Sequence, residues 1–162
     1  MKTVNKGILS SIDIVNYKPK YQIHFQKLNE QWINHYFKLE DNDVEVLMNP
    51  EKHIINQGGY ILFAKKANHI LGCIAMNYEG YGIFELNKMA VKTNYRNNGI
   101  GKMLIEACLE KARDKKAIKI ILSTQKGLRN AIHIYESYGF RQMSYVNLKH
   151  SRSDVYMELS LK

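Results

Sequence analysis

The chain has 162 residues, of which 45% are hydrophobic, a composition that suits one domain over residues 1–162 with a buried core and argues against intrinsic disorder. It carries 24 Lys and Arg against 15 Asp and Glu, a formal net charge of +9, which favours anionic ligands in general. Because the basic residues are dispersed along the chain, we expect no nucleic-acid partner. No run reaches the ~18 apolar residues of a membrane span, so we expect no membrane association.

The first half of the chain predicts a strand, two helices and a three-stranded meander. A short strand is expected at 12–16, and apolar residues recur at helical spacing from Pro19 to Phe37. A second helix is expected over 43–56, with a break near Pro50. The strand-like runs that follow are separated by short turns, which indicates antiparallel pairing. These three predicted strands cover 60–64, 69–78 and 83–91.

The second half alternates helices and strands. Helical spacing of apolar residues predicts a helix over 98–115, and a β-branched run predicts a strand at 118–123. A second helical stripe runs from Ala131 to Tyr138 and is closed by Gly139, a residue type common just after a helix end. The two final strands are expected at 140–146 and 154–161. Since strand–helix–strand around 98–115 requires a crossover, we expect an α+β fold with a mixed sheet.

The two cysteines, Cys73 and Cys108, lie far apart in apolar runs, and neither a CxxC pair nor a metal-ligand spacing is present. This pattern favours buried free thiols in a reducing compartment and no metal site. The N-terminal apolar run is too short for the core of a secretion signal. We therefore expect a cytoplasmic location.

The stretch YRNNGIGKML, residues 95–104, carries two glycines one residue apart between a predicted strand and a predicted helix. A P-loop alignment fails because Arg96 stands in place of its first glycine and Met103 in place of its hydroxyl residue. A dinucleotide-binding alignment fails because Leu104 stands in place of its third glycine. The pattern R/Q-x-x-G-x-G/A fits at every defined position.

This third pattern suits a pyrophosphate. Successive backbone N–H groups without obstructing side chains can close on the anion, and the N-terminus of the helix adds partial positive charge. Arg96 and Lys102 place full positive charges nearby. The alternative is a plain strand-to-helix turn in which the glycines only make the turn tight.

The segments ELNKMAV and RNNGIGKML, followed by IKIIL and AIHIYESYGF, resemble the GNAT superfamily of acetyl-CoA-dependent N-acetyltransferases. The resemblance implies a mixed, mostly antiparallel sheet flanked by helices, with one strand splayed from the next. It implies acetyl-CoA as the cofactor and leaves a homodimer open. It places the pantetheine arm along the strand edge at Met89, Ala90 and Val91, and Arg96 near the pyrophosphate. The backbone amides implied for the pyrophosphate are those of Asn97, Asn98, Gly99, Ile100, Gly101 and Lys102.

Acetyl transfer to an amine needs a neutral amine, a polarised thioester oxygen and a proton for the leaving thiolate. The resemblance implies Glu85 as the general base; the alternative is a strand glutamate in a salt bridge or in solvent, with water as the base. It implies Tyr135 as the general acid, for which a core tyrosine is the alternative. A strand backbone N–H near Met89 or Val91 would polarise the thioester.

Many members of the family carry an asparagine where this chain has Leu128, so Asn130 either replaces it at the cofactor or caps its helix. The first helix and the loop after it often line the acceptor site in this fold, which suggests Tyr36 and Glu40. The expected function is acetylation of a primary amine on a small molecule or a protein. The alternative is a non-catalytic acyl-CoA sensor, which would not need both Glu85 and Tyr135.

Overall fold

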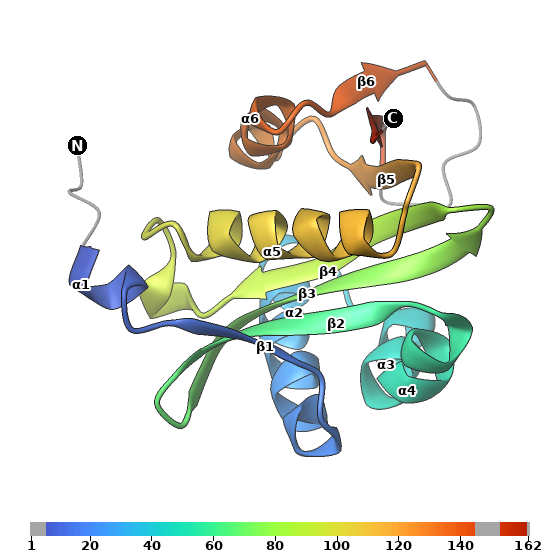
Figure 1. Cartoon of the computed structure of the whole chain (residues 1–162). Coiled ribbons are helices and arrows are strands. Elements are labelled where there is room, and N and C mark those ends of the chain that lie inside the picture. The colour runs from blue at the N-terminus through green and yellow to red at the C-terminus, as the bar shows by residue number, and fades with distance from the viewer. Residues whose placement is uncertain (1–5, 145–152, 162) are drawn as a thin grey trace.

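The computed structural model describes residues 6–144 and 153–161. These residues form a seven-stranded sheet in the order β1-β2-β3-β4-β5-β7-β6, antiparallel throughout except between β4 and β5 (Figure 1). The predicted α+β fold with a mixed sheet is confirmed. The strands are β1 (Asp13–Asn16), β2 (Tyr60–Lys66), β3 (His69–Gly80), β4 (Ile83–Val91), β5 (Lys119–Thr124), β6 (Arg141–Met143) and β7 (Val155–Ser160). The helices are α1 (Lys6–Leu9), α2 (Gln22–Tyr36), α3 (Asp41–Met48), α4 (Pro50–His53), α5 (Ile100–Asp114) and α6 (Arg129–Ser137).

Two apolar clusters cover opposite faces of the sheet. Helix α5 lies over one face and α2, α3 and α4 lie on the other (Figure 1). Successive residues of β2 point to opposite faces, so Leu62 packs in the α5 cluster while Phe63 packs in the α2 cluster. Both cysteines are buried free thiols, as predicted: Cys108 lies on the α5 side and Cys73 on the α2 side. Burial raises the pKa of each thiol to about 12, so both stay protonated.

Most predicted elements are found within a few residues of their expected ends. The predicted break at Pro50 is confirmed, because α3 ends at Met48 and Pro50 opens α4 at the position where a missing N–H is tolerated. Helix α1 is not predicted from the sequence, since four residues are too few to show helical spacing. Of the predicted strand 140–146, β6 occupies Arg141–Met143, and residues 145 and 146 lie outside the described part of the chain.

Strand β4 contains a β-bulge in its second half. Cys73 of β3 pairs with Ala90 and Ala75 pairs with Asn87, so two residues of β4 oppose one residue of β3. Lys88, in the bulge, has a left-handed backbone with a φ of 51°. A bulge bends its strand, and β4 pairs with β5 only over Ile83–Glu85. The remainder of β4 therefore diverges from β5, which confirms the expected splay.

The bulge also positions a buried ion pair. The Lys88 ammonium lies 3.0 Å from a carboxylate oxygen of Asp43 in α3, and the two side chains are only 16% and 4% exposed. We predict that Lys88→Met lowers the free energy of unfolding by about 2 kcal/mol, because it leaves the Asp43 carboxylate buried without its cation. Chemical denaturation measures this change.

Lys119→Met is the matched control for this prediction. Lys119 lies 3.5 Å from Glu158, but its side chain is 38% exposed, so its loss should lower the free energy of unfolding by less than about 1 kcal/mol. Equal losses in the two variants would show that the Lys88–Asp43 pair adds nothing beyond a surface pair.

Candidate functional site

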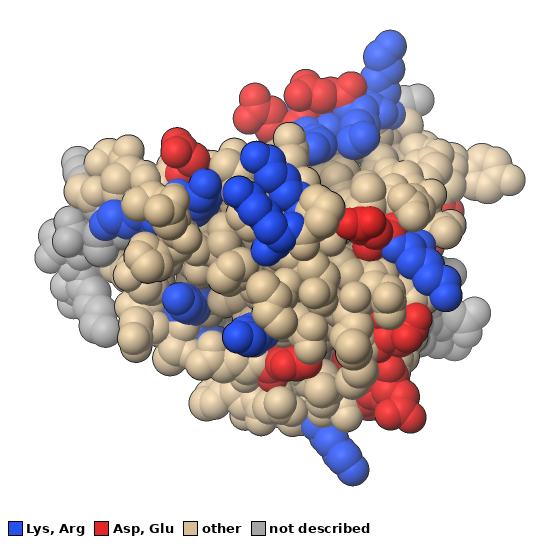
Figure 2. Space-filling view, turned by 90° about the horizontal axis from the view of Figure 1, so that it is seen from below, with Lys and Arg blue, Asp and Glu red and all other residues tan. Residues whose placement is uncertain are grey.

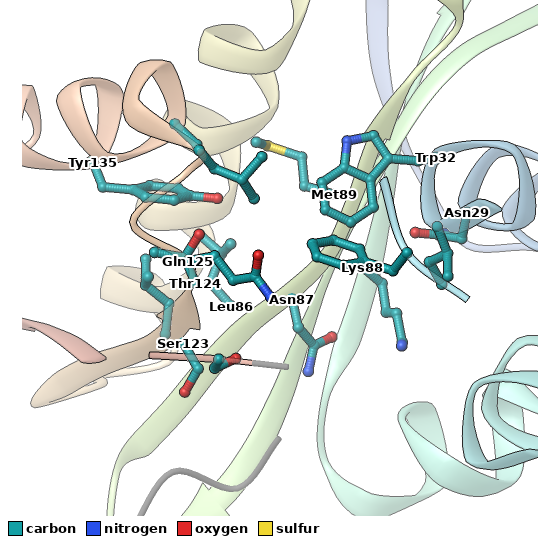
Figure 3. Close-up of a pocket in the computed structure, with 16 residues that line it drawn as sticks. Asn29, Trp32, Leu86, Asn87, Lys88, Met89, Ser123, Thr124, Gln125 and Tyr135 are labelled. Atoms are coloured by element: carbon teal, nitrogen blue, oxygen red, sulfur yellow. The ribbon is translucent and has the colours of Figure 1, made fainter. Parts of the chain in front are cut away.

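Two adjoining cavities open where β4 leaves β5. Cavity A has a volume of about 220 Å³ and lies where the strands diverge, between α2 on one side and α6 on the other (Figure 3). Cavity B has a volume of about 420 Å³ and extends along the end of β4 toward the glycine turn. Five residues line both cavities and form the wall between them. These are Trp32, Met89, Leu128, Ala131 and Tyr135.

Tyr135 stands at the junction of the two cavities. Its ring extends from α6 and its hydroxyl points into the open space of cavity A, on the side opposite Trp32 (Figure 3). The residue is only 8% exposed, and burial raises the pKa of its phenol to about 12, so the hydroxyl carries its proton at neutral pH. Within residues 6–144 and 153–161, the hydroxyl has no hydrogen-bond partner. It is therefore available as a donor to a ligand.

The neighbouring Tyr138 has a different environment. Its hydroxyl donates a hydrogen bond of 2.7 Å to the carboxylate of Glu106 in α5, and it lines neither cavity. Tyr138 packs against the α5 cluster and is separated from the candidate site.

The glycine turn has the backbone geometry of an anion cradle. Asn97 and Gly99 have left-handed φ values of 64° and 88°, and Gly99 is the N-cap of α5. The Arg96 Nε donates to the carbonyl of Val91 at 3.0 Å, which ties the turn to the end of β4. The first N–H groups of a helix have no intrahelical acceptor, so those of Ile100, Gly101 and Lys102 can meet a phosphate oxygen.

Gly101 leaves that surface open. Among the described residues, no heavy atom would lie within 4 Å of a Cβ added to Gly101. Its backbone is helical, so neither the protein fold nor its φ angle requires glycine there. The Ile100 side chain is buried in the α5 cluster. A pyrophosphate would need such an open surface, and its binding at this turn stays a prediction.

Cavity B brings together most of the residues predicted to bind the cofactor. Asn130 is the second residue of α6 and lines the cavity, while Leu128 occupies the N-cap position, so the alternative of Asn130 as the cap is wrong. The predicted cofactor residues that line it are Met89, Ala90, Val91, Arg96, Asn97 and Asn130. The other five predicted residues do not line the cavity and continue the turn beyond it. These are Asn98, Gly99, Ile100, Gly101 and Lys102.

Glu85 is buried in β4, only 4% exposed, which excludes the alternative of a solvent-facing side chain. Its carboxylate accepts a hydrogen bond of 3.2 Å from the Nδ2 of Asn87. Asn87 lines cavity A, whereas Glu85 itself lines neither cavity. Asn87 is not predicted from the sequence as a site residue. The available signal was its position two residues after Glu85, which puts both on one face of the strand.

The two residues suggested for the acceptor differ in their positions. Tyr36 is 46% exposed and stacks beside Trp32, with ring centroids 5.1 Å apart, at the edge of cavity B. Glu40 is the N-cap of α3, where its side chain accepts from the backbone N–H of Asp43 and Asp43 accepts from the N–H of Glu40 at 3.0 Å. Glu40 lines neither cavity.

The described residues offer little sign of other classes of site. No group of three His, Cys, Asp or Glu side chains is arranged to hold a metal ion, and none of the described helices combines the length and apolarity needed to cross a membrane. On the face shown in Figure 2, Lys and Arg side chains lie in separate patches with acidic side chains between them. The expectation that nucleic acid is not a partner stays a prediction.

An open mixed sheet with a bulged, splayed strand and a glycine turn at a helix N-terminus defines an acyl-CoA-dependent acyltransferase fold. The model of the acetyltransferase (GNAT) family matches residues 21–140, well over half of the chain. The chain therefore belongs to this family, and the resemblance seen in the sequence is confirmed.

Solved structures and curated proteins agree with this assignment. A GNAT-family acetyltransferase from Staphylococcus aureus Mu50 is 25% identical, with a TM-score of 0.81 over 93% of this chain and 99% of that one. PaiA N-acetyltransferase from Thermoplasma acidophilum, solved with coenzyme A, shares the fold at a TM-score of 0.73 and 18% identity, over 93% of this chain and 99% of that one. Streptothricin acetyltransferase A of Bacillus subtilis is 28% identical over 68% of this chain. The chain spans 62% of that protein and 38% of an N-acetyltransferase from Dictyostelium discoideum that is 33% identical over 49% of this chain.

Proposed function

We propose that this chain transfers the acetyl group of acetyl-CoA to a primary amine. The observation that carries the proposal is the position of the Tyr135 hydroxyl, unpaired within the described ranges, at the junction of cavities A and B. Cavity B runs from this hydroxyl to the glycine turn, a path suited to a pantetheine arm and its pyrophosphate. Cavity A reaches the same hydroxyl from the other side and can hold the acceptor.

The residues then have distinct tasks. The backbone amides from Asn97 to Lys102 bind the pyrophosphate, and the backbone of Met89 to Val91, freed from β5 by the splay, pairs with the pantetheine amides. Acetyl-CoA supplies an activated carbonyl carbon, to which the amine nitrogen bonds as the carbon–sulfur bond breaks. Tyr135 gives its proton to the departing sulfur, and Glu85 accepts the proton of the amine through water.

We predict that Glu85→Gln lowers kcat/KM about tenfold near neutral pH. The loss should shrink at about pH 9.5, because a larger fraction of the amine is then neutral without a base. Glutamine can still accept the hydrogen bond from Asn87, so this contact is preserved. The exposed Glu79→Gln is the control. A pH-independent loss would show that Glu85 acts through structure and that water is the base.

The proposal is tested by measuring free thiol released from acetyl-CoA across a panel of amines, with acetyl-CoA binding measured separately by calorimetry. Amine-dependent thiol release is expected. Binding of acetyl-CoA without stimulation by any amine would overturn the enzyme function and support a non-catalytic acyl-CoA sensor.

A further inference from the structure

The lining of cavity A carries information about the acceptor, given the acetyltransferase function proposed above. We propose that the acceptor is a compact primary monoamine with an aromatic or apolar body and no second positive charge. The volume of about 220 Å³ lies below the usual range for small-molecule pockets, roughly 300–1,000 Å³, which favours a small acceptor.

The walls of cavity A suit a flat apolar body. Trp32 and Phe37, at the end of α2, lie with ring centroids 5.7 Å apart and both line the cavity. Aromatic rings arranged in this way can pack around another ring or a short alkyl chain. The other apolar lining residues are Ile33, Leu86, Met89, Leu122, Leu128 and Ala131.

Asn87 provides a polar contact for the amine. Its Nδ2 donates to Glu85, while its Oδ1 is buried and has no hydrogen-bond partner among the described residues. A buried amide oxygen without a partner is unfavourable, so a rotation of this side chain toward cavity A, where an N–H of the acceptor would satisfy the oxygen, should be favoured. The same hydrogen bond to Glu85 would fix the orientation of the amide, so that Asn87 holds the nitrogen within reach of the water that connects it to Glu85.

The lack of acidic side chains in the lining of cavity A disfavours an acceptor with a second ammonium group. All 15 Asp and Glu residues lie within 6–144 and 153–161, and none lines cavity A. Two lining residues contact carboxylates that lie behind the cavity wall. Lys88 forms an ion pair with Asp43, and Asn87 donates a hydrogen bond to Glu85, so both carboxylates already have partners. The reacting amine loses its proton, but a second ammonium stays charged and would be desolvated without a counter-charge. The net charge of +9 adds repulsion.

The decisive experiment compares benzylamine with 4-(aminomethyl)benzylamine, which differs by one ammonium group. We expect kcat/KM for the diamine to be at least about tenfold lower, and spermidine and a lysine-containing peptide to be poorer still. Better turnover of the diamine, spermidine or peptide than of benzylamine would overturn the monoamine proposal and leave the acetyltransferase function standing. Binding of acetyl-CoA with no turnover of any amine would overturn both.

A charge variant tests the physical cause. Gln125 lines cavity A, and Gln125→Glu introduces a carboxylate of nearly the same shape. We expect this variant to narrow the difference between the diamine and benzylamine at least about threefold. Gln57→Glu, at an exposed position that lines neither cavity, is the matched control and should leave the ratio unchanged. An unchanged ratio in Gln125→Glu would contradict the role of charge in acceptor selection.

Discussion

Tyr135→Phe is expected to lower kcat about 100-fold while changing the affinity for acetyl-CoA less than about twofold. The phenol hydroxyl is the proton donor at the junction of the cavities, and within the described ranges it makes no hydrogen bond that the substitution would break. The ring keeps its packing against Phe140, 5.8 Å between centroids, so the fold should be unaffected. Steady-state kinetics and calorimetric titration separate the two quantities.

The pH profile of this loss tests whether the hydroxyl keeps its proton over the working range, and the comparison of kcat with cofactor affinity separates an acid from a packing residue. Burial raises the pKa of Tyr135 to about 12, so the hydroxyl stays protonated up to about pH 10. The ratio of wild-type to variant kcat should therefore be constant between about pH 6 and pH 10. Tyr138→Phe, which removes a hydrogen bond to Glu106 outside both cavities, is the control and should keep kcat within about twofold. Parallel losses of kcat and cofactor affinity in Tyr135→Phe would identify Tyr135 as structural.

Local sequence patterns were sufficient for the parts of the site that are built within one segment. The glycine turn and the helix after it depend on residues close together in the chain, and both occur where predicted, with Gly99 as the N-cap of α5. The break at Pro50 follows from the missing N–H of proline. The stripe that carries Tyr135 likewise follows from helical spacing.

Features that depend on contacts between distant segments were not predictable. The bulge at Lys88 has no sequence signature of its own, and it is accompanied by an ion pair with Asp43, 45 residues earlier in the chain. The divergence of β4 from β5 then makes Asn87 a cavity residue. The capping role of Glu40 was hidden because Glu is an uncommon N-cap. The placement of β7 between β5 and β6 likewise depends on which edge the last strand reaches.

Gly101→Leu is expected to weaken acetyl-CoA binding at least 100-fold, about 2.7 kcal/mol, without destabilising the protein. The site of the new side chain is open among the described residues, and leucine is a better helix former than glycine, so the melting temperature should stay the same or rise. The side chain would occupy the space in which the phosphate oxygens approach the backbone amides. Calorimetric titration and thermal unfolding of the same sample measure both effects.

Two further substitutions separate steric blocking from backbone strain. Gly101→Ala adds only a Cβ, and the R/Q-x-x-G-x-G/A pattern admits alanine there, so its affinity should stay within about threefold of wild type. Gly99→Ala instead forces a left-handed φ of 88° on an L-residue and should lower the free energy of unfolding by about 1 kcal/mol. A Gly101→Leu protein that binds acetyl-CoA normally would mean that the pyrophosphate lies elsewhere. Because the turn has room for the leucine side chain, Gly101→Leu should not disturb the fold. A loss of binding without a loss of stability would therefore come from a clash between that side chain and the bound acetyl-CoA.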